Sequence, residues 1–137
     1  MSLSVFDIFK IGIGPSSSHT MGPMNAARSF VELLAVRGLL KRTAEISAQL
    51  YGSLALTGRG HCTDRAILLG LEGASPDTID PGLIEPALQR IRASGRIHLL
   101  GRHEIAFDEP LNLLFHIDQV LPGHSNGMRF KIGRAHV

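Results

Sequence analysis

The chain has 137 residues, of which 44% are hydrophobic and 19% are charged, and its formal net charge is +2. This length and apolar content are enough for one globular domain with its own core. No apolar run is long enough to span a bilayer and the N-terminus lacks a signal-peptide layout, so we expect a cytoplasmic protein with no membrane partner. The single cysteine, Cys62, excludes an internal disulfide.

The small basic excess depends on the last residues of the chain. Residues 131–137 back-translate to a sequence that resembles the start of a widely used sequencing adapter. We therefore expect residues 1–130 to form the domain and residues 131–137 to be a non-native read-through tail, with a natural or cloned tail as the alternative. Without Lys131 and Arg134, the Lys and Arg residues fall from 14 to 12 and equal the 12 Asp and Glu residues. Charge then gives no reason to expect nucleic acid as a partner.

The first predicted elements are a short lead-in, Ser4–Ile8, and a helix. Met24, Ala27, Val31 and Leu34 recur at helical spacing, which predicts a helix as far as Val36, closed by Gly38. Next, residues 45–56 alternate between polar and apolar and predict a strand. The residues expected on its buried face are Ile46, Ala48 and Leu50.

The second half of the chain alternates between helix and strand patterns. Thr63 or Asp64 is expected to cap a helix, and Ile84–Ile91 predicts another, with Pro86 near its first turn and Gly95 after its end. Residues 96–107 predict one or two strands, and residues 111–117 a final strand. The pattern predicts an α/β or α+β layered domain in which helices cover a mixed sheet.

A polar segment, Gly12–Pro23, lies just before the first predicted helix. A helix N-terminus offers unpaired N–H groups and a partial positive charge, which bind carboxylates and phosphates. A helix cap needs only one hydroxyl group. This segment has three serines, a threonine and a histidine, which predicts a small-anion site rather than a cap alone. His19 could bind a carboxylate as imidazolium, fix the loop, or be incidental. The residues of this candidate site are Ser16, Ser17, Ser18, His19 and Thr20.

A second candidate lies around His61. The glycines on either side of Arg59 would let the backbone approach a ligand, and the Arg59 guanidinium suits a carboxylate. Asp64 could fix the tautomer of the His61 ring or cap the following helix. A Gly-rich turn with an incidental histidine is the alternative.

A third candidate is the polar group His124, Ser125 and Asn126, which an ordinary turn would also explain. The remaining internal histidines have strand-like surroundings and are predicted to be structural: His98, His103 and His116. No histidine or cysteine pair has metal-ligand spacing, so no metal site is expected. One cysteine cannot hold an iron–sulfur cluster, which normally needs about four thiolates.

Three ordered blocks of this sequence carry a family resemblance: residues 4–24, 51–64 and 124–130. Together they resemble the N-terminal, beta-type domain of the bacterial iron–sulfur L-serine dehydratases (L-serine ammonia-lyases). The resemblance runs over nearly the whole chain. Members of that family usually have lysine where Arg59 stands, and the exchange matters if this side chain contacts an anion.

The resemblance implies an enzyme that eliminates water from L-serine to give pyruvate and ammonia. It implies a [4Fe–4S] cluster, held by cysteines of a separate C-terminal catalytic domain, that acts as a Lewis acid on the serine hydroxyl. It further implies a homodimer in which this domain binds the substrate carboxylate and supplies His61 or His124 for acid–base work. The implied substrate-binding residues are Ser16–Thr20, Arg59, Asp64, Ser125 and Asn126.

Two other functions remain open at this point. The beta-type domain is similar in fold to the allosteric substrate-binding domain of some D-3-phosphoglycerate dehydrogenases, so the chain could be a regulatory module that binds a small anion without catalysis. It could also be a structural dimerisation domain, in which case the serine-rich segment would have no ligand.

Overall fold

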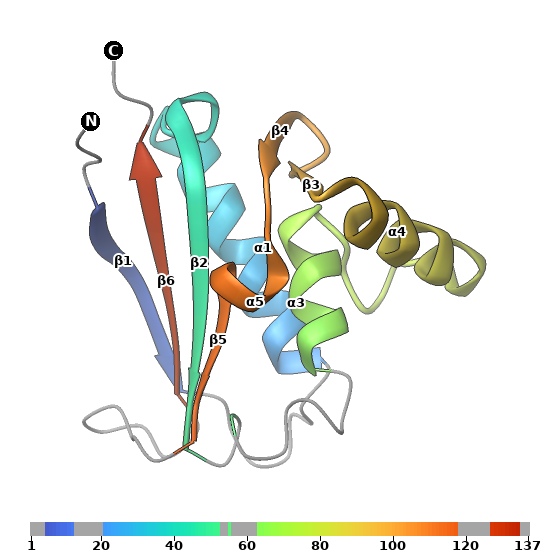
Figure 1. Ribbon diagram of the computed structural model, residues 1–137, viewed down its shortest axis with the longest axis horizontal. Helices are drawn as coiled ribbons and strands as arrows, with labels where there is room; N and C mark the ends of the chain where they lie inside the picture. The colour runs from blue at the N-terminus through green and yellow to red at the C-terminus, as the bar shows by residue number, and fades with distance from the viewer. Residues whose placement is uncertain (1–4, 13–20, 53–54, 56–62, 118–126, 135–137) are drawn as a thin grey trace.

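The computed structural model describes residues 5–12, 21–52, 55, 63–117 and 127–134. These residues form helices on a mixed sheet, which confirms the predicted α+β class (Figure 1). In chain order the elements are β1 (Val5–Gly12), α1 (Met21–Val36), the short 3-10 helix η2 (Leu40–Arg42), β2 (Thr43–Tyr51), α3 (Thr63–Leu71), α4 (Pro81–Ser94), β3 (Arg96–Leu99), β4 (His103–Ala106), α5 (Glu109–Asn112), β5 (Leu113–His116) and β6 (Gly127–Arg134).

The main sheet has four strands in the order β1-β6-β2-β5. Strand β6 is antiparallel to both of its neighbours, β1 and β2, whereas β5 is parallel to β2. Helices α1 and α3 lie on one side of this sheet, α4 lies beyond α3, and β4 of the β3–β4 hairpin lies beside the start of β2 (Figure 1). The last described strand is therefore a central one, and it joins the N-terminal strand to the rest of the sheet.

The helix ends follow the local sequence signals. Helix α1 extends to Val36 as predicted, and Gly38 after it has a φ of +70°, which a residue with a Cβ rarely adopts. Helix α4 begins earlier than predicted, because the Asp80 side chain accepts a hydrogen bond of 2.9 Å from the N–H of Gly82. This earlier start leaves Pro86 inside the helix rather than in its first turn. Gly95 closes the helix with a φ of +66°, as predicted.

The inner face of the sheet is apolar and packs on the helices. Ile46, Ala48 and Leu50 of β2 are at most 1% exposed, as their alternation predicted. Phe30 of α1 stacks on Phe130 of β6 with ring centroids 4.8 Å apart. These contacts belong to one continuous cluster of buried, mostly aliphatic side chains.

Helices α1 and α3 approach closely at Gly70. A Cβ atom at this position would lie 2.4 Å from the carbonyl oxygen of Met24 and 2.9 Å from the Cβ of Ala27. Both obstacles belong to the first half of α1 and neither can move cheaply. The missing side chain at Gly70 thus fixes the distance between the two helices.

Two segments differ from their predicted structure. The lead-in, Ser4–Ile8, belongs to a full strand, β1, whose backbone pairs with β6 from Val5 to Gly12. The predicted strand at 111–117 begins instead with the short helix α5, and only Leu113–His116 pair with β2. The helical turn closes because Asn112 accepts a hydrogen bond from the N–H of Asp108 and returns one to its carbonyl.

The expectation that residues 131–137 lie outside the fold is wrong for residues 131–134. These residues form the second half of β6 and pair with both β1 and β2, and Ile132 is 1% exposed. The sequence pattern that was missed is the alternation of Met128, Phe130 and Ile132, which has the period of a strand. Strand pairing is made by backbone groups, which a segment of any origin has. The pairing of residues 131–134 therefore does not test whether residues 131–137 come from an adapter, and this origin stays a prediction.

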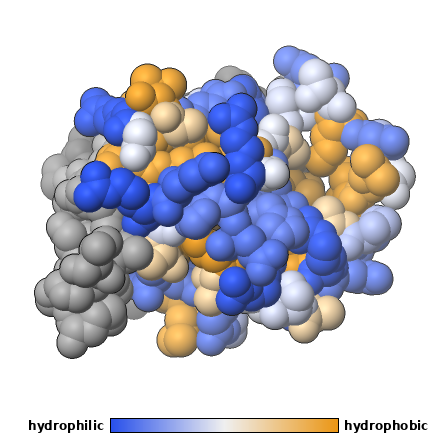
Figure 2. All heavy atoms as spheres, turned by 90° about the horizontal axis from the view of Figure 1, so that it is seen from above, coloured by the Kyte–Doolittle hydropathy of each residue, from blue (hydrophilic) through white to orange (hydrophobic). Residues whose placement is uncertain are grey.

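The described surface carries only scattered large apolar side chains. In the view of Figure 2 hydrophilic groups cover much of the molecule, and the hydrophobic ones form separate patches. No helix in the described part of the chain combines the length and the apolar character that crossing a membrane requires. The most exposed large apolar residues are Val36, Leu83, Leu111 and Ile117.

The role of β6 predicts the effect of shortening Ile132. Replacing Ile132 by Ala should lower the free energy of unfolding by about 2–5 kcal/mol, because it empties a filled core position. Chemical denaturation measures this loss, and Lys131→Ala on the same strand is the control, expected to cost less than half as much. Equal, small effects of the two changes would mean that residues 131–134 do not pack as described.

Candidate functional site

Most of the candidate site residues lie outside the described residues. These are Ser16, Ser17, Ser18, His19, Thr20, Arg59, His61, His124, Ser125 and Asn126. Their arrangement therefore stays a prediction. Of the candidate residues, the structure describes Asp64. It also describes the strands and helices that precede and follow each of the three candidate segments.

These strand ends meet at one edge of the sheet. One row across the sheet joins Ile11, Met128, Leu50 and Phe115 by backbone pairing. In the next row Gly12 of β1 pairs with Gly127 of β6, and Tyr51 of β2 pairs with His116 of β5. Beyond this row the chain leaves the sheet toward residues 13–20, 53–62 and 118–126. All three candidate segments therefore start or end at the same edge, shown at the bottom of Figure 1.

Two helices begin at this same end of the molecule. Helix α1 starts at Met21, directly after the serine-rich segment, and α3 starts at Thr63, directly after the segment with Arg59 and His61. Figure 1 shows both N-terminal ends beside the sheet edge. Since helix N-termini carry a partial positive charge, their proximity makes this edge favourable for an anion.

Asp64 lies in the first turn of α3, where its carboxylate is held by the chain's own groups. One oxygen accepts a 2.8 Å hydrogen bond from the N–H of Arg65, and the other lies 3.6 Å from the Arg92 guanidinium. Arg92 also binds Glu109 through two hydrogen bonds of 2.9 and 3.1 Å. The hydrogen bond to Glu109 raises the pKa of Arg92. A guanidinium is always charged in proteins, and the contacts of this one with Asp64 and Glu109 join α3, α4 and α5.

A polar cluster that sequence reasoning missed lies beside the edge, on the outer face of the sheet. The Gln49 carbonyl oxygen lies 2.9 Å from the Tyr51 hydroxyl and 2.9 Å from Nε2 of His116. The rings of Tyr51 and His116 stack at 4.7 Å, and the Arg129 guanidinium lies 5.7 Å from the centre of the Tyr51 ring. The signal that would have found this cluster is the alternation of Ser47, Gln49 and Tyr51 opposite the apolar face of β2.

The other two described histidines have local partners. His98 contacts Glu104 at 2.8 Å, and the hydrogen bonds from His98 and from Arg96 lower the pKa of Glu104. His103 contacts the carbonyl of Thr43 at 2.8 Å and so connects β4 to β2. These contacts support the structural role predicted for both, whereas His116 belongs to the polar cluster.

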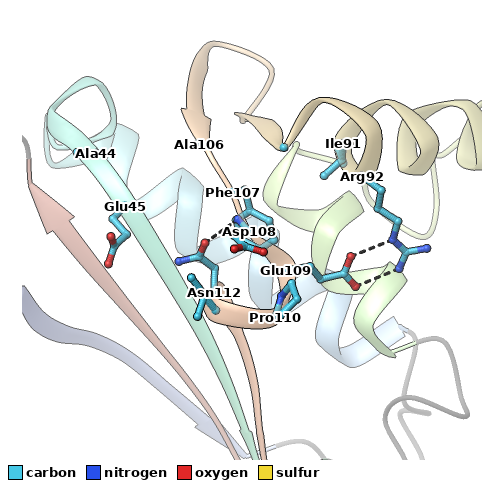
Figure 3. A pocket seen from close by; sticks show the side chains of 12 residues that line it. Ala44, Glu45, Ile91, Arg92, Ala106, Phe107, Asp108, Glu109, Pro110 and Asn112 are labelled. Carbon is cyan, nitrogen blue, oxygen red and sulfur yellow. Dashed lines mark hydrogen bonds and ion pairs between the residues drawn. The ribbon is translucent and has the colours of Figure 1, made fainter.

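A cavity of about 660 Å³ lies away from this edge, between the first half of β2, the end of α4 and α5 (Figure 3). Part of its polar lining is paired internally. Arg92 binds Glu109 there, and the Asn112 side chain accepts from the N–H of Asp108 (Figure 3). We therefore take the sheet edge, with its two helix N-termini and its polar cluster, as the candidate site.

The described residues include no group of three or more His, Cys, Asp or Glu side chains placed to hold a metal ion. With one cysteine in the whole chain, the residues present do not fit a cluster that needs about four thiolates. No chemical step of this chain is therefore assigned to such a cluster.

Comparison with known proteins shows the family. Residues 4–136 match the family model described as "Serine dehydratase beta chain". The chain belongs to this family. It is 53% identical over 128 residues to an L-serine dehydratase of Streptomyces coelicolor and 51% identical over 128 residues to L-serine dehydratase 2 of Escherichia coli, and both alignments cover 93% of this chain and 28% of the relative. It is 49% identical over 136 residues to an L-serine dehydratase of Mycobacterium tuberculosis, covering 99% of this chain and 29% of the relative.

The family resemblance found in the three sequence blocks is thus confirmed. The chain spans less than a third of the length of these relatives.

The Arg92 contact predicts a measurable coupling between α4 and α5. In a double-mutant cycle of Arg92→Gln and Glu109→Gln, the coupling free energy should be about 0.5–1 kcal/mol and should fall with added salt, because the pair is partly exposed. Chemical denaturation of the four proteins measures it. The Arg96–Glu104 pair, with both side chains nearly half exposed, is the matched control and should show a smaller coupling. A coupling no larger than this control would mean that Arg92 does not tie these helices.

Proposed function

We propose that this chain is the substrate-binding beta domain of an iron–sulfur L-serine ammonia-lyase, which converts L-serine into pyruvate and ammonia. Relatives that cover nearly the whole chain are named L-serine dehydratases, which supports this activity. The observation that carries the assignment of the site is the sheet edge, where all three family blocks are anchored and two helices begin.

The proposed division of labour follows from what each group can do. Ser16–Thr20, ahead of α1, bind the substrate carboxylate with hydroxyl groups and the helix N-terminus. Arg59, Ser125 and Asn126 complete this polar site. Asp64, in the first turn of α3, is a further substrate-binding residue of this site. His61 or His124 moves protons, since an imidazole exchanges them near neutral pH.

The Lewis acid for the leaving hydroxyl belongs, in this proposal, to a separate catalytic domain of a longer protein. That domain would hold a [4Fe–4S] cluster with its own cysteines and meet this chain at the sheet edge. The alignments cover only 28–29% of each relative, so the rest of the relatives' length is enough for such a domain. A homodimer and a cytoplasmic location complete the proposal.

Comparing the complete protein with the isolated chain tests this function. After anaerobic reconstitution with iron and sulfide, the complete protein should form pyruvate from L-serine and show cluster absorption. The chain of residues 1–137, treated alike, should do neither, because it has only Cys62 as a thiol. A complete protein with a cluster but no turnover of L-serine would overturn the activity, and cluster-dependent turnover by the chain alone would overturn the division between domains.

The serine-rich segment has its own prediction. Replacing Ser17 and Ser18 together by Ala in the complete enzyme should raise KM for L-serine at least about tenfold, because each lost hydrogen bond to a charged group is worth roughly 1.5–3 kcal/mol. Steady-state kinetics and chemical denaturation of the same variant separate this role from helix capping. An unchanged KM with about 1 kcal/mol less stability would show that these serines only cap α1. A change confined to kcat would place them in transition-state stabilisation instead.

A further inference from the structure

The first half of β2 has a free edge. Strand β5 pairs with β2 only from Ala48 to Tyr51, because the residues before β5 form the helical turn α5 instead of a strand. The residues of β2 that precede Ala48 therefore have β6 on one side and no strand on the other. Among the described residues, Ala44–Ser47 form no backbone hydrogen bond outside the strand pairings. Since the N–H and C=O groups of a strand point alternately to its two sides, about half of theirs face the side without a strand.

The cavity of about 660 Å³ lies against this free edge (Figure 3). Ala44 and Glu45 line it on one side, and residues 106–112 line it on the other. One end of the free edge lies where the His103 ring contacts the carbonyl of Thr43 at 2.8 Å, and the other end lies at the first pair of β5. Ligand sites in proteins have volumes of about 300–1,000 Å³, so the cavity has the size of a binding site.

The lining of the cavity has more negative than positive side chains. It includes the acidic residues Glu45, Asp108 and Glu109 and the cation Arg92. Arg92 and Glu109 neutralise each other through two hydrogen bonds. Glu45 and Asp108 are exposed, and neither carboxylate forms an ion pair or a hydrogen bond with a described residue. A cationic group of a ligand would therefore gain two carboxylate partners without displacing an existing contact.

Apolar side chains line the same cavity. Ile91 and Phe107 belong to the core and are 2% and 3% exposed, whereas Leu111 is 70% exposed. Successive side chains of an extended peptide point to opposite sides. An extended segment in the cavity can therefore direct apolar side chains toward these residues and basic side chains toward the carboxylates.

We propose that this cavity binds an extended basic segment of a partner protein, which pairs with the free edge of β2 and places Lys or Arg side chains beside Glu45 and Asp108. Backbone hydrogen bonds to the edge give affinity, and the two carboxylates select basic side chains. The same carboxylates disfavour a second copy of this chain, because pairing the two β2 edges would bring like charges together. The interaction is independent of the proposed turnover of L-serine.

Peptide binding to the full chain, residues 1–137, tests this interaction. The probe is acetyl-Arg-Val-Arg-Val-Arg-amide, and ¹H–¹⁵N NMR of the backbone amides follows its binding. We expect saturable shifts that are largest in residues 44–47 and 106–112, and an affinity that falls with added salt. The same peptide with Glu in place of each Arg should bind at least about tenfold more weakly, because its charges repel the carboxylates. Methylation of every amide nitrogen of the basic peptide should abolish binding, because the peptide then has no N–H group for strand pairing.

Single substitutions test the two carboxylates. Glu45→Gln and Asp108→Asn should each weaken binding of the basic peptide about twofold to fivefold, because each removes one exposed charge pair. Asp77→Asn is the matched control, since Asp77 is also exposed but does not line the cavity, and it should leave the affinity unchanged. Docking at this edge would be overturned by any of four results: no saturable binding of the basic peptide, equal binding of the Glu peptide, undiminished binding of the methylated peptide, or equal effects of Asp77→Asn and Asp108→Asn.

Discussion

The pairing of β6 between β1 and β2 is the interaction on which the described structure depends. Strand β6 comes last in the chain, yet both of its edges are hydrogen-bonded, and its inner face carries Phe130 and Ile132 into the core. Without it, β1 would have no strand partner among the described residues. The same pairing brings Gly12 opposite Gly127 and Leu50 opposite Met128, so the register of β6 also sets where the candidate segments leave the sheet.

The two faces of the sheet serve different purposes because side chains alternate along each strand. On the inner face, aliphatic residues of β2 pack against α1 and α3, whose spacing is limited by the contact of Gly70 with Met24. On the outer face, Gln49 and Tyr51 bury polar groups that are satisfied mutually and by His116. The apolar face stabilises the fold without fixing the orientation of polar groups, whereas the hydrogen bonds on the outer face are directional and fix the positions of the side chains that form them.

A domain that binds substrate without a metal of its own, as we propose for this chain, must present its groups in a fixed geometry. The candidate edge has one feature for this, since two helix N-termini begin at that end of the molecule and favour an anion. Arg92 of α4 contacts Asp64 in the first turn of α3 and Glu109 of α5. These contacts hold the start of α3 against the second half of the chain. The site that we propose is therefore supported by elements from both halves of the chain.

Local signals in the sequence determined helices α1, α3 and α4, the buried face of β2 and the family. The spacing of Met24, Ala27, Val31 and Leu34, and the glycines after α1 and α4, are read within one element and need no partner. The tertiary structure alone decided that β1 is a strand and that residues 131–134 pair in the middle of the sheet, because strand pairing joins residues far apart in the chain. It also decided the cluster of Gln49, Tyr51 and His116, since an alternating polar pattern does not say which side chain of another strand will face it.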